Sequence, residues 1–171
     1  MTERNEHLIR AAGASDSESM AKIYNHYITQ TVVTFEVEAV TATEMSRRME
    51  QVQVASLPWL VAESGGDVVG YAYASPWHAR YAYRFAAETT VYLDYQHGGR
   101  GIGSALYEVL LTELSSKGMH TVIGGIALPN VASVALHEKF GYCKSAHYKE
   151  VGFKFGRWID VGYWQKMLVG Q

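Results

Sequence analysis

The sequence predicts a single domain of the α/β or α+β class. Its 171 residues are enough for one hydrophobic core. Hydrophobic residues make up 48% of the chain, which is too many for a disordered protein. Strand-like and helix-like apolar patterns are interspersed from end to end, without a repeat or a low-complexity linker. We therefore treat residues 1–171 as one domain.

The composition argues against several classes of protein. The formal net charge is −2 and no long basic run occurs, so a dedicated nucleic-acid binder is not expected. No apolar stretch reaches ~18 residues, and the N-terminus MTERNEHLIR lacks a signal-peptide core. Cys143 is the only cysteine, and the seven histidines form no metal-binding motif. These observations predict a cytoplasmic protein with no membrane span, no internal disulfide and no metal.

The first third of the chain predicts a strand and two helices. A short strand is expected around residues 7–11. Residues 15–18, SDSE, have the spacing of a capping box, and apolar residues follow at helical spacing over 20–28. Residues 41–44, TATE, form a second such box, which predicts a helix to about Val54.

The middle of the chain predicts three strands. Pro58 precedes the strand WLVAE, and residues 64–67, SGGD, are typical of a hairpin turn. The returning strand is expected over 68–74. An aromatic loop over 76–86 then leads to ETTVYLD, residues 88–94, which alternates like a strand.

The last third predicts two helices and three strands. A long amphipathic helix begins at Ile102 and closes near Gly118. TVIGGIA, residues 121–127, is typical of a buried strand. A short helix capped by Asn130 ends at Gly141. Two further strands are expected, over 142–150 and 161–168.

Four glycines fall within residues 98–103, between a predicted strand and a long helix. Such a loop leaves free N–H groups at a helix N-terminus, where the helix dipole favours a phosphate. A P-loop would place Lys after the last glycine, where Ser104 stands. A Rossmann fingerprint would place its third glycine at Ser104 and would lie nearer the start of the domain. The remaining alternatives are a flexible connector and a loop of the type Q/R-x-x-G-x-G/A.

That last pattern resembles the pyrophosphate loop of the GCN5-related N-acetyltransferases. Gly98 stands where that family has Gln or Arg, so one side-chain contact is absent. The stretch LPNVASVALHEKFGY, residues 128–142, is similar to the family segment N-x-x-A/S-x-x-L-Y-x-K-x-G-F, with His137 in place of Tyr. NHYI, PWLVAE, PWHARYAY, ETTVYL and FGRWIDVGYWQ resemble the phosphinothricin and methionine sulfoximine acetyltransferases over nearly the whole chain.

The resemblance implies a central mixed, mostly antiparallel sheet flanked by helices, and an acetyl-CoA-dependent enzyme that acts on a small amino acid. It also implies a homodimer. In this family the strand that holds residues 91–93 binds the pantetheine amides and diverges from its neighbour. The residues expected to contact acetyl-CoA are Val91, Tyr92, Leu93, Gly99, Arg100, Gly101, Ile102, Gly103, Ser104, Asn130 and Ser133.

Two side chains are candidates for proton transfer. Glu88 begins the ETTVYLD strand and shares a face with Thr90, so its carboxylate could take a proton from an ammonium. The alternative is an ordinary edge glutamate, and the resemblance implies a general base. His137 lies seven residues after Asn130 on one helix face. It could protonate a departing thiolate, relay the amine proton or simply pack in the core.

Substrate selection is expected in the loop SPWHARYAYRFAAE. The residues expected to contact the substrate are Phe35, His78, Arg80, Tyr83, Glu88 and Thr90. Arg80 could hold a carboxylate or phosphinate through its planar fork. The phosphinothricin enzymes carry Lys where His78 stands, so methionine sulfoximine and methionine sulfone are at least equal candidates.

Two other functions remain open from the sequence. One is a protein N-terminal or lysine acetyltransferase, which would need an open peptide groove. The bulky aromatic loop favours an enclosed pocket instead. The other is a non-catalytic acyl-CoA-binding module, against which Glu88, Asn130 and His137 together argue.

Overall fold

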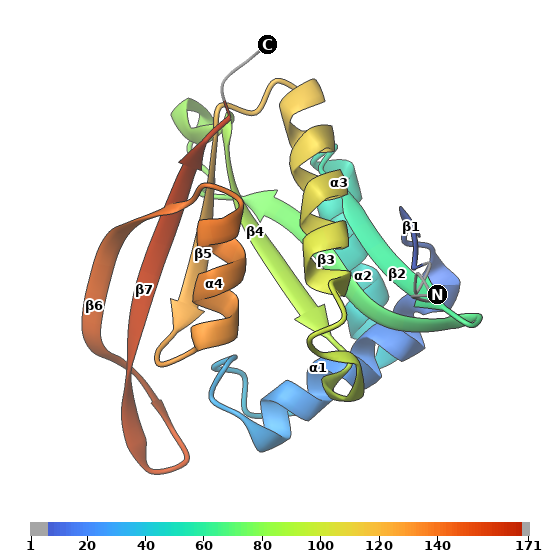
Figure 1. The fold of residues 1–171 in the computed structure, drawn as a ribbon, viewed down its shortest axis with the longest axis horizontal. Coiled ribbons are helices and arrows are strands. Elements are labelled where there is room, and N and C mark those ends of the chain that lie inside the picture. The colour runs from blue at the N-terminus through green and yellow to red at the C-terminus, as the bar shows by residue number, and fades with distance from the viewer. Residues whose placement is uncertain (1–6, 169–171) are drawn as a thin grey trace, which may run out of the picture.

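A seven-stranded mixed sheet organises the chain (Figure 1). The computed structural model describes residues 7–168. The strands are β1 (Leu8–Ala11), β2 (Trp59–Ser64), β3 (Asp67–Pro76), β4 (Ala86–Leu93), β5 (Thr121–Ala127), β6 (Cys143–Lys154) and β7 (Arg157–Met167). Their order in the sheet is β1-β2-β3-β4-β5-β7-β6. Among these described strands only β4 and β5 pair in parallel, so the predicted mixed, mostly antiparallel sheet is confirmed.

Four helices cover the two faces of this sheet. They are α1 (Ser17–Gln30), α2 (Ala42–Val54), α3 (Ile102–Ser116) and α4 (Val131–Lys139). Helices α3 and α4 lie on one face, and α1 and α2 lie on the other (Figure 1). Within residues 7–168, no helix is both long and apolar enough to span a membrane.

Local sequence signals explain most element boundaries. The Thr41 hydroxyl accepts a bond from the Glu44 N–H at 3.1 Å and begins α2. Gly65 and Gly66 have φ values of 61° and 90°, so both adopt the left-handed geometry that the β2–β3 hairpin turn requires. Asn130 accepts from the Ser133 N–H at 3.1 Å and caps α4 as predicted.

The capping box predicted over residues 15–18 is wrong. Helix α1 begins at Ser17, after a single 3₁₀ turn over Ala14–Asp16. The Asp16 carboxylate accepts from Arg10 at 2.8 and 2.9 Å and from the Gly13 N–H at 2.8 Å. It therefore ties the turn to β1 instead of capping the helix.

The C-terminal hairpin is longer than predicted. Strand β6 runs four residues beyond the expected end at Glu150, and β7 begins four residues before Val161. The turn lies at Phe155 and Gly156, which have φ values of 50° and 72°. Several aromatic residues of both strands are exposed, so apolar and polar residues do not alternate regularly there. The periodicity of the sequence therefore did not predict the full length of this hairpin.

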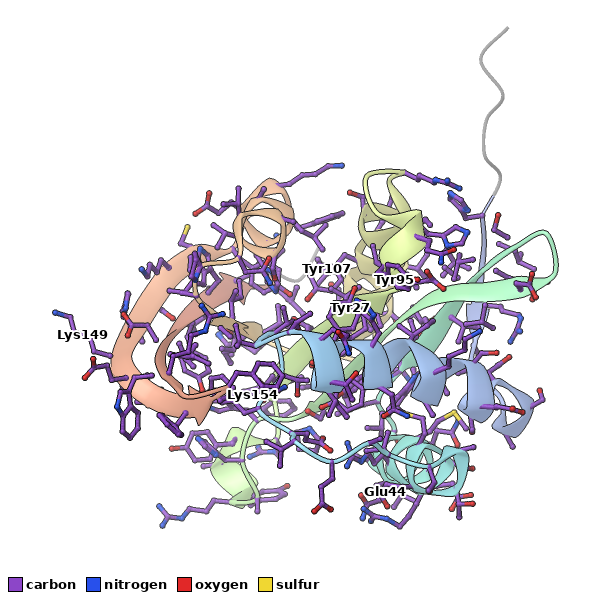
Figure 2. All side chains as sticks on the ribbon, turned by 90° about the horizontal axis from the view of Figure 1, so that it is seen from below. Tyr27, Glu44, Tyr95, Tyr107, Lys149 and Lys154 are labelled. Carbon is purple, nitrogen blue, oxygen red and sulfur yellow. The ribbon has the colours of Figure 1, made fainter. Side chains whose placement is uncertain are left out.

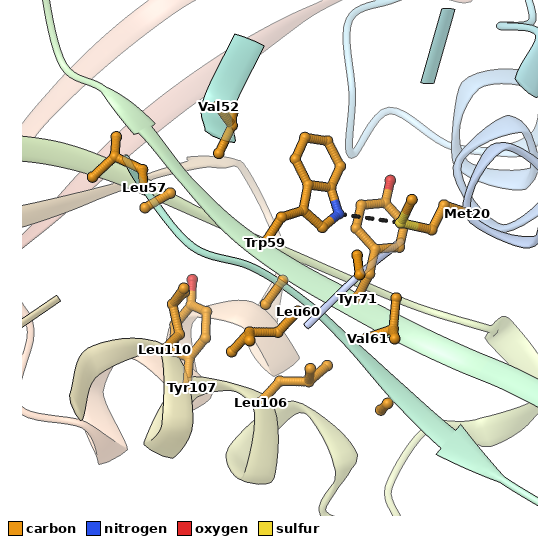
Figure 3. Close-up of a cluster of buried hydrophobic side chains, with 14 of the residues drawn as sticks. Met20, Val52, Leu57, Trp59, Leu60, Val61, Tyr71, Leu106, Tyr107 and Leu110 are labelled. Atoms are coloured by element: carbon orange, nitrogen blue, oxygen red, sulfur yellow. Dashed lines mark hydrogen bonds between the residues drawn. The ribbon is translucent and has the colours of Figure 1, made fainter. Parts of the chain in front are cut away.

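The core fills both faces of the sheet (Figure 3). On the α1–α2 side, the Trp59 indole N–H points to the Met20 sulfur at 3.1 Å. On the α3 side, Leu60 of β2 packs near Leu106 and Leu110. All these side chains are buried, so the central strands are held rigidly where they reach the site.

Strands β4 and β5 pair only at their beginnings. Three residue pairs join them, ending at Glu88 and Ile123. Beyond that point β4 continues to Leu93 with a partner on the β3 side alone. The divergence of β4 from its neighbour that the family resemblance implies is therefore present. It leaves a gap in the sheet, with α3 and α4 on one face of the gap and the segment from α1 to α2 on the other.

Candidate active site

A cleft of about 160 Å³ lies where β4 and β5 diverge. Strand β4 supplies one wall, β5 and α4 supply the other, and Val33 of the α1–α2 loop closes one side. The lining residues are Val33, Tyr73, Glu88, Thr89, Thr90, Val91, Tyr92, Tyr107, Gly125, Ile126, Ala127, Asn130, Ser133 and His137. Polar groups from four different elements thus converge on one opening.

Glu88 presents a carboxylate to this cleft from the α1–α2 face. It shares that face with Tyr73 and Thr90, since Glu88 pairs with Ser75 of β3. Glu88 also pairs with Ile123 of β5, and Gly125, two residues further on, pairs with Tyr163 of β7, so Tyr163 lies on the same face. Burial raises the pKa of the Glu88 carboxyl above its ordinary 4.5, and only the nearby His78 opposes this. A half-buried carboxylate with a raised pKa is a suitable proton acceptor for an amine.

His137 approaches the cleft from the opposite face of the sheet. Its side chain is 3% exposed, and a Cβ on Gly124 of β5 would overlap its ring. Its Nδ1 lies 2.7 Å from the Ser133 carbonyl oxygen, which can only accept, so Nδ1 carries the proton. Burial lowers the pKa of the ring below its ordinary 6.5. His137 is therefore neutral at pH 7, with a lone pair on Nε2.

A chain of hydroxyl groups extends from that lone pair. The Tyr107 hydroxyl donates to His137 Nε2 at 3.0 Å and lies 3.5 Å from the Thr89 hydroxyl. Thr89 in turn bonds the Tyr142 hydroxyl at 2.9 Å. Burial raises the pKa of both tyrosines. The chain is thus a neutral network that links α3, α4 and β4 directly behind Glu88, and it is a poor source of acid.

Replacing Tyr107 by Phe should show whether this network positions groups or donates protons. We expect turnover to fall by less than about tenfold. The melting temperature should fall because His137 Nε2 loses its buried donor, a loss of about 1–3 kcal/mol. Thermal unfolding and steady-state kinetics measure both effects. If turnover instead falls by roughly 10²-fold or more at an unchanged melting temperature, Tyr107 is a proton donor.

The glycine loop ends at the N-terminus of α3. Gly99 and Gly101 have φ values of 76° and 79°, and Gly101 is the N-cap residue. The first helical backbone bond runs from the Ala105 N–H to the Gly101 carbonyl. The N–H groups of residues 102–104 therefore have no partner within the helix and face outward at its positive end. This is a binding site suited to an anion such as a pyrophosphate.

The first turn of α3 packs against the C-terminal half of α4. A Cβ on Gly103 would come within 3.4 Å of Leu136, so the absence of a side chain lets the two helices approach. Lys139 donates to the Ser104 hydroxyl at 2.8 Å and places a cation beside the α3 N-terminus. Asn130 and Ser133 then line the cleft on the same helix as His137.

The structure brings some of the candidate site residues together and leaves others apart. Those that line the cleft are Glu88, Thr90, Val91, Tyr92, Asn130, Ser133 and His137. Phe35 packs against Gly152 of β6, and Tyr83 packs on His78 with ring centroids 4.9 Å apart. Arg80 lines a separate hollow beside Leu57 and Met119. Its role in substrate binding stays a prediction.

Sequence patterns did not identify eight residues of the site: Val33, Tyr73, Thr89, Tyr107, Gly125, Ile126 and Ala127 of the cleft lining, and Tyr142 of the hydroxyl network. One signal for Tyr107 was available. It occupies a core position of α3 beside Leu106, and a buried tyrosine hydroxyl needs a partner. The rest depend on pairing between distant strands, which periodicity along one strand does not reveal. Within residues 7–168, no three His, Cys, Asp or Glu side chains gather closely enough to hold a metal ion.

Comparisons with known proteins agree with this geometry. The phosphinothricin N-acetyltransferase of Streptomyces viridochromogenes is 43% identical over 164 residues, covering 96% of this chain and 89% of the relative. The L-methionine sulfoximine/L-methionine sulfone acetyltransferase of Salmonella typhimurium is 34% identical, covering 94% of each chain. A phosphinothricin acetyltransferase from Sinorhizobium meliloti, solved in complex with acetyl-CoA, superposes with a TM-score of 0.92 at 34% identity, covering 96% and 89% of the two chains. The sequence model of the acetyltransferase (GNAT) domain matches residues 9–162, and the chain therefore belongs to the GNAT family of N-acetyltransferases.

Proposed function

We propose that this enzyme transfers the acetyl group of acetyl-CoA to the α-amine of a small amino acid, with Glu88 as the general base. The acceptors we propose are methionine sulfone, methionine sulfoximine and phosphinothricin. One observation carries the proposal: the Glu88 carboxylate, with its raised pKa, faces a cleft between diverging strands.

The residues present fit acetyl-CoA. The N–H groups at Gly101–Ser104 suit its pyrophosphate. From Thr89 to Leu93, the edge of β4 that faces β5 pairs with no strand, so its backbone groups are free to bond the pantetheine amides. Asn130 and Ser133 add polar groups on the α4 side. When bound, acetyl-CoA supplies the thioester carbonyl, and main-chain N–H groups of β4 are placed to polarise it.

The proton balance of the reaction gives Glu88, on one face of the sheet, a different role from His137 and Tyr107 on the other face. The nitrogen of the acceptor ammonium loses two protons as the amide forms and the carbon–sulfur bond breaks. One passes through Glu88 to solvent, and the other ends on the departing sulfur. The reaction needs no net proton from His137 or Tyr107, in keeping with their neutral, buried network. We propose that these two residues position β4 and α4 around the reacting groups.

The acceptor side of the cleft is enclosed, which favours a small acceptor over a peptide. The α1–α2 loop is bound to the far strand β6, because the buried Lys154 amine donates to the Thr34 carbonyl at 2.8 Å. A Cβ on Gly152 would overlap the Phe35 ring, so the loop also packs closely against β6. Figure 2 shows Lys154 reaching inward between the hairpin and this loop. Val33 of the same loop lines the cleft.

Replacing Lys154 by Met should loosen this enclosure. We expect the KM for the amine acceptor to rise by about fivefold, because a hydrogen bond from a charged group contributes about 1.5–3 kcal/mol and only part of that acts on the loop. The KM for acetyl-CoA should not change. Lys149→Met on the same strand is the control, since Lys149 points to solvent (Figure 2). An unchanged acceptor KM in folded Lys154→Met would separate the loop from acceptor binding.

We also propose a homodimer, with the β6–β7 hairpin at its interface. Five large apolar side chains of this hairpin are between 54% and 61% exposed: Tyr148, Val151, Phe153, Phe155 and Trp158. An exposed apolar patch of this kind is typical of an interaction surface. A monomeric mass in light scattering at micromolar concentration would contradict this part of the proposal.

An acceptor panel tests the proposed function. Release of free CoA should be followed with methionine sulfone, methionine sulfoximine, phosphinothricin, ordinary amino acids and a peptide with a free N-terminus, at saturating acetyl-CoA. We expect kcat/KM to be highest for one of the three analogues and lowest for the peptide. Preference for the peptide would establish the protein acetyltransferase instead, and binding of acetyl-CoA without any turnover would establish the binding module.

A further inference from the structure

A bare patch of backbone lies opposite Glu88 in the cleft. Gly125 of β5 is exposed, although both of its neighbours in the sequence are buried. It pairs directly with Tyr163 of β7, so the two residues share the face on which Glu88 lies. A side chain at residue 125 would therefore project into the space between the Glu88 carboxylate and the Tyr163 ring.

The distances define this space closely. The position that a Cβ of Gly125 would occupy is 3.3 Å from Glu88 Oε1. The same position is 3.1 and 3.6 Å from the adjacent ring carbons Cε1 and Cδ1 of Tyr163. This position is only a bond length from the Gly125 Cα, so a substrate nitrogen lies just outside it, in van der Waals contact with Gly125. An ammonium nitrogen placed so would lie beside both the Glu88 carboxylate and the Tyr163 ring, where a charge-assisted hydrogen bond and cation–π attraction act.

The Tyr163 ring is held in place by two further aromatic rings. Trp77, at the start of the aromatic loop, lies edge-on to it with centroids 5.8 Å apart. Tyr148 of β6 does the same from the other strand, also at 5.8 Å. His78 continues the cluster, with its centroid 4.8 Å from that of Trp77. An aromatic wall with one carboxylate is the chemistry that recognises a compact cation.

We propose that the acceptor's ammonium group binds over Gly125, between the Glu88 carboxylate and the Tyr163 ring, and that Tyr163 is a specificity-determining residue for the cationic acceptor. This inference rests on the proposed function. It assigns Gly125 the task of leaving room for the nitrogen and Tyr163 the task of binding the charge before Glu88 removes a proton. It also places the amine on the face of β4 opposite to the His137 network.

The test uses the full chain, with methionine sulfone as acceptor. Tyr163→Leu should raise the KM for methionine sulfone by about 5- to 30-fold, the factor that corresponds to a cation–π contact of about 1–2 kcal/mol. Tyr163→Phe keeps the ring and should restore the acceptor KM to within about threefold of wild type. Gly125→Ala should raise the acceptor KM at least as much as Tyr163→Leu, because its methyl group would fill the space in which the nitrogen contacts Gly125. The KM for acetyl-CoA should not change in any of the three.

Two controls and a binding measurement separate this role from a general loss of structure. Tyr95→Leu removes an exposed tyrosine outside the cleft and outside the aromatic loop, and Gly13→Ala adds a methyl group with no atom nearer than 3.9 Å. Protection of the protein against thermal unfolding by methionine sulfone, in the presence of CoA, should weaken in Tyr163→Leu. Inhibition by the neutral N-acetyl product should change much less than binding of the amine.

The outcomes distinguish this inference from the function on which it rests. If the wild type does not acetylate methionine sulfone, the proposed function fails and the inference fails with it. If the wild type turns over but folded Tyr163→Leu keeps its acceptor KM, the function stands and the ammonium site is wrong. Equal increases in both KM values, or equal weakening of amine and product, would likewise overturn the site. If Gly125→Ala does not fold, the acceptor KM values of Tyr163→Leu and Tyr163→Phe still test the ammonium site.

Discussion

Replacing Glu88 by Gln is expected to lower kcat by roughly 10²–10⁴-fold while leaving the protein folded. The amide keeps the shape of the side chain but cannot accept a proton from the ammonium. Because burial raises the pKa of Glu88, the folded state favours the neutral acid, and the ionised carboxylate costs stability as pH rises through that pKa. The melting temperature of Glu88→Gln at neutral pH should therefore equal or exceed that of the wild type.

The pH dependence gives this prediction a second readout. Wild-type kcat should fall as pH falls through the pKa of Glu88, with a midpoint above the ordinary 4.5 of a glutamate. The residual activity of Glu88→Gln should lack that acidic limb. Glu108→Gln, an exposed glutamate on α3, is the matched control. Wild-type turnover in folded Glu88→Gln would show that Glu88 is structural.

Replacing Gly101 by Val is expected to produce the second largest effect, through loss of acetyl-CoA binding. Gly101 has a φ of 79°, and a β-branched residue is strained in that conformation by about 1–2 kcal/mol. The loop can relieve the strain only by turning its N–H groups away from the positions that begin α3. We expect the Kd for acetyl-CoA to rise by at least about tenfold, measured by the shift in melting temperature that the ligand causes.

The same loop supplies the control for this experiment. Gly98 has an ordinary φ of −63°, and a Cβ there would meet no atom within 4 Å. Gly98→Ala should therefore bind acetyl-CoA as the wild type does. An equal shift in melting temperature for wild type and folded Gly101→Val would remove the loop from the acetyl-CoA site.

The elements with strong local signals could be predicted from the sequence. The caps at Thr41 and Asn130 and the hairpin at Gly65–Gly66 depend only on neighbouring residues, and all three are present. The glycine loop ends at the start of α3 for the same reason, with Gly101 as the N-cap residue. The start of α1 could not be predicted, because Asp16 is held by Arg10 of a strand instead of capping the helix.

The cleft could be predicted less well from the sequence, because segments far apart in the chain form it. Glu88 was identified from its place in one strand, but the partners across the cleft belong to β5 and β7. His137 Nε2 accepts a hydrogen bond from Tyr107, which lies 30 residues away in another helix. Arg80 lies in the expected loop but lines a different hollow, since the 3₁₀ turn Tyr81–Tyr83 determines how that loop runs. Only the three-dimensional pairing of strands shows which of these groups meet.

The most direct test of the account is a crystal structure of the enzyme with CoA and N-acetyl-methionine sulfone. We predict the pyrophosphate at the N–H groups of residues 101–104 and the pantetheine arm between β4 and β5. The amide nitrogen of the product should lie over Gly125, within hydrogen-bonding distance of Glu88 directly or through one water. CoA bound outside the gap between β4 and β5, or a product nitrogen on the His137 face of the sheet, would contradict the account.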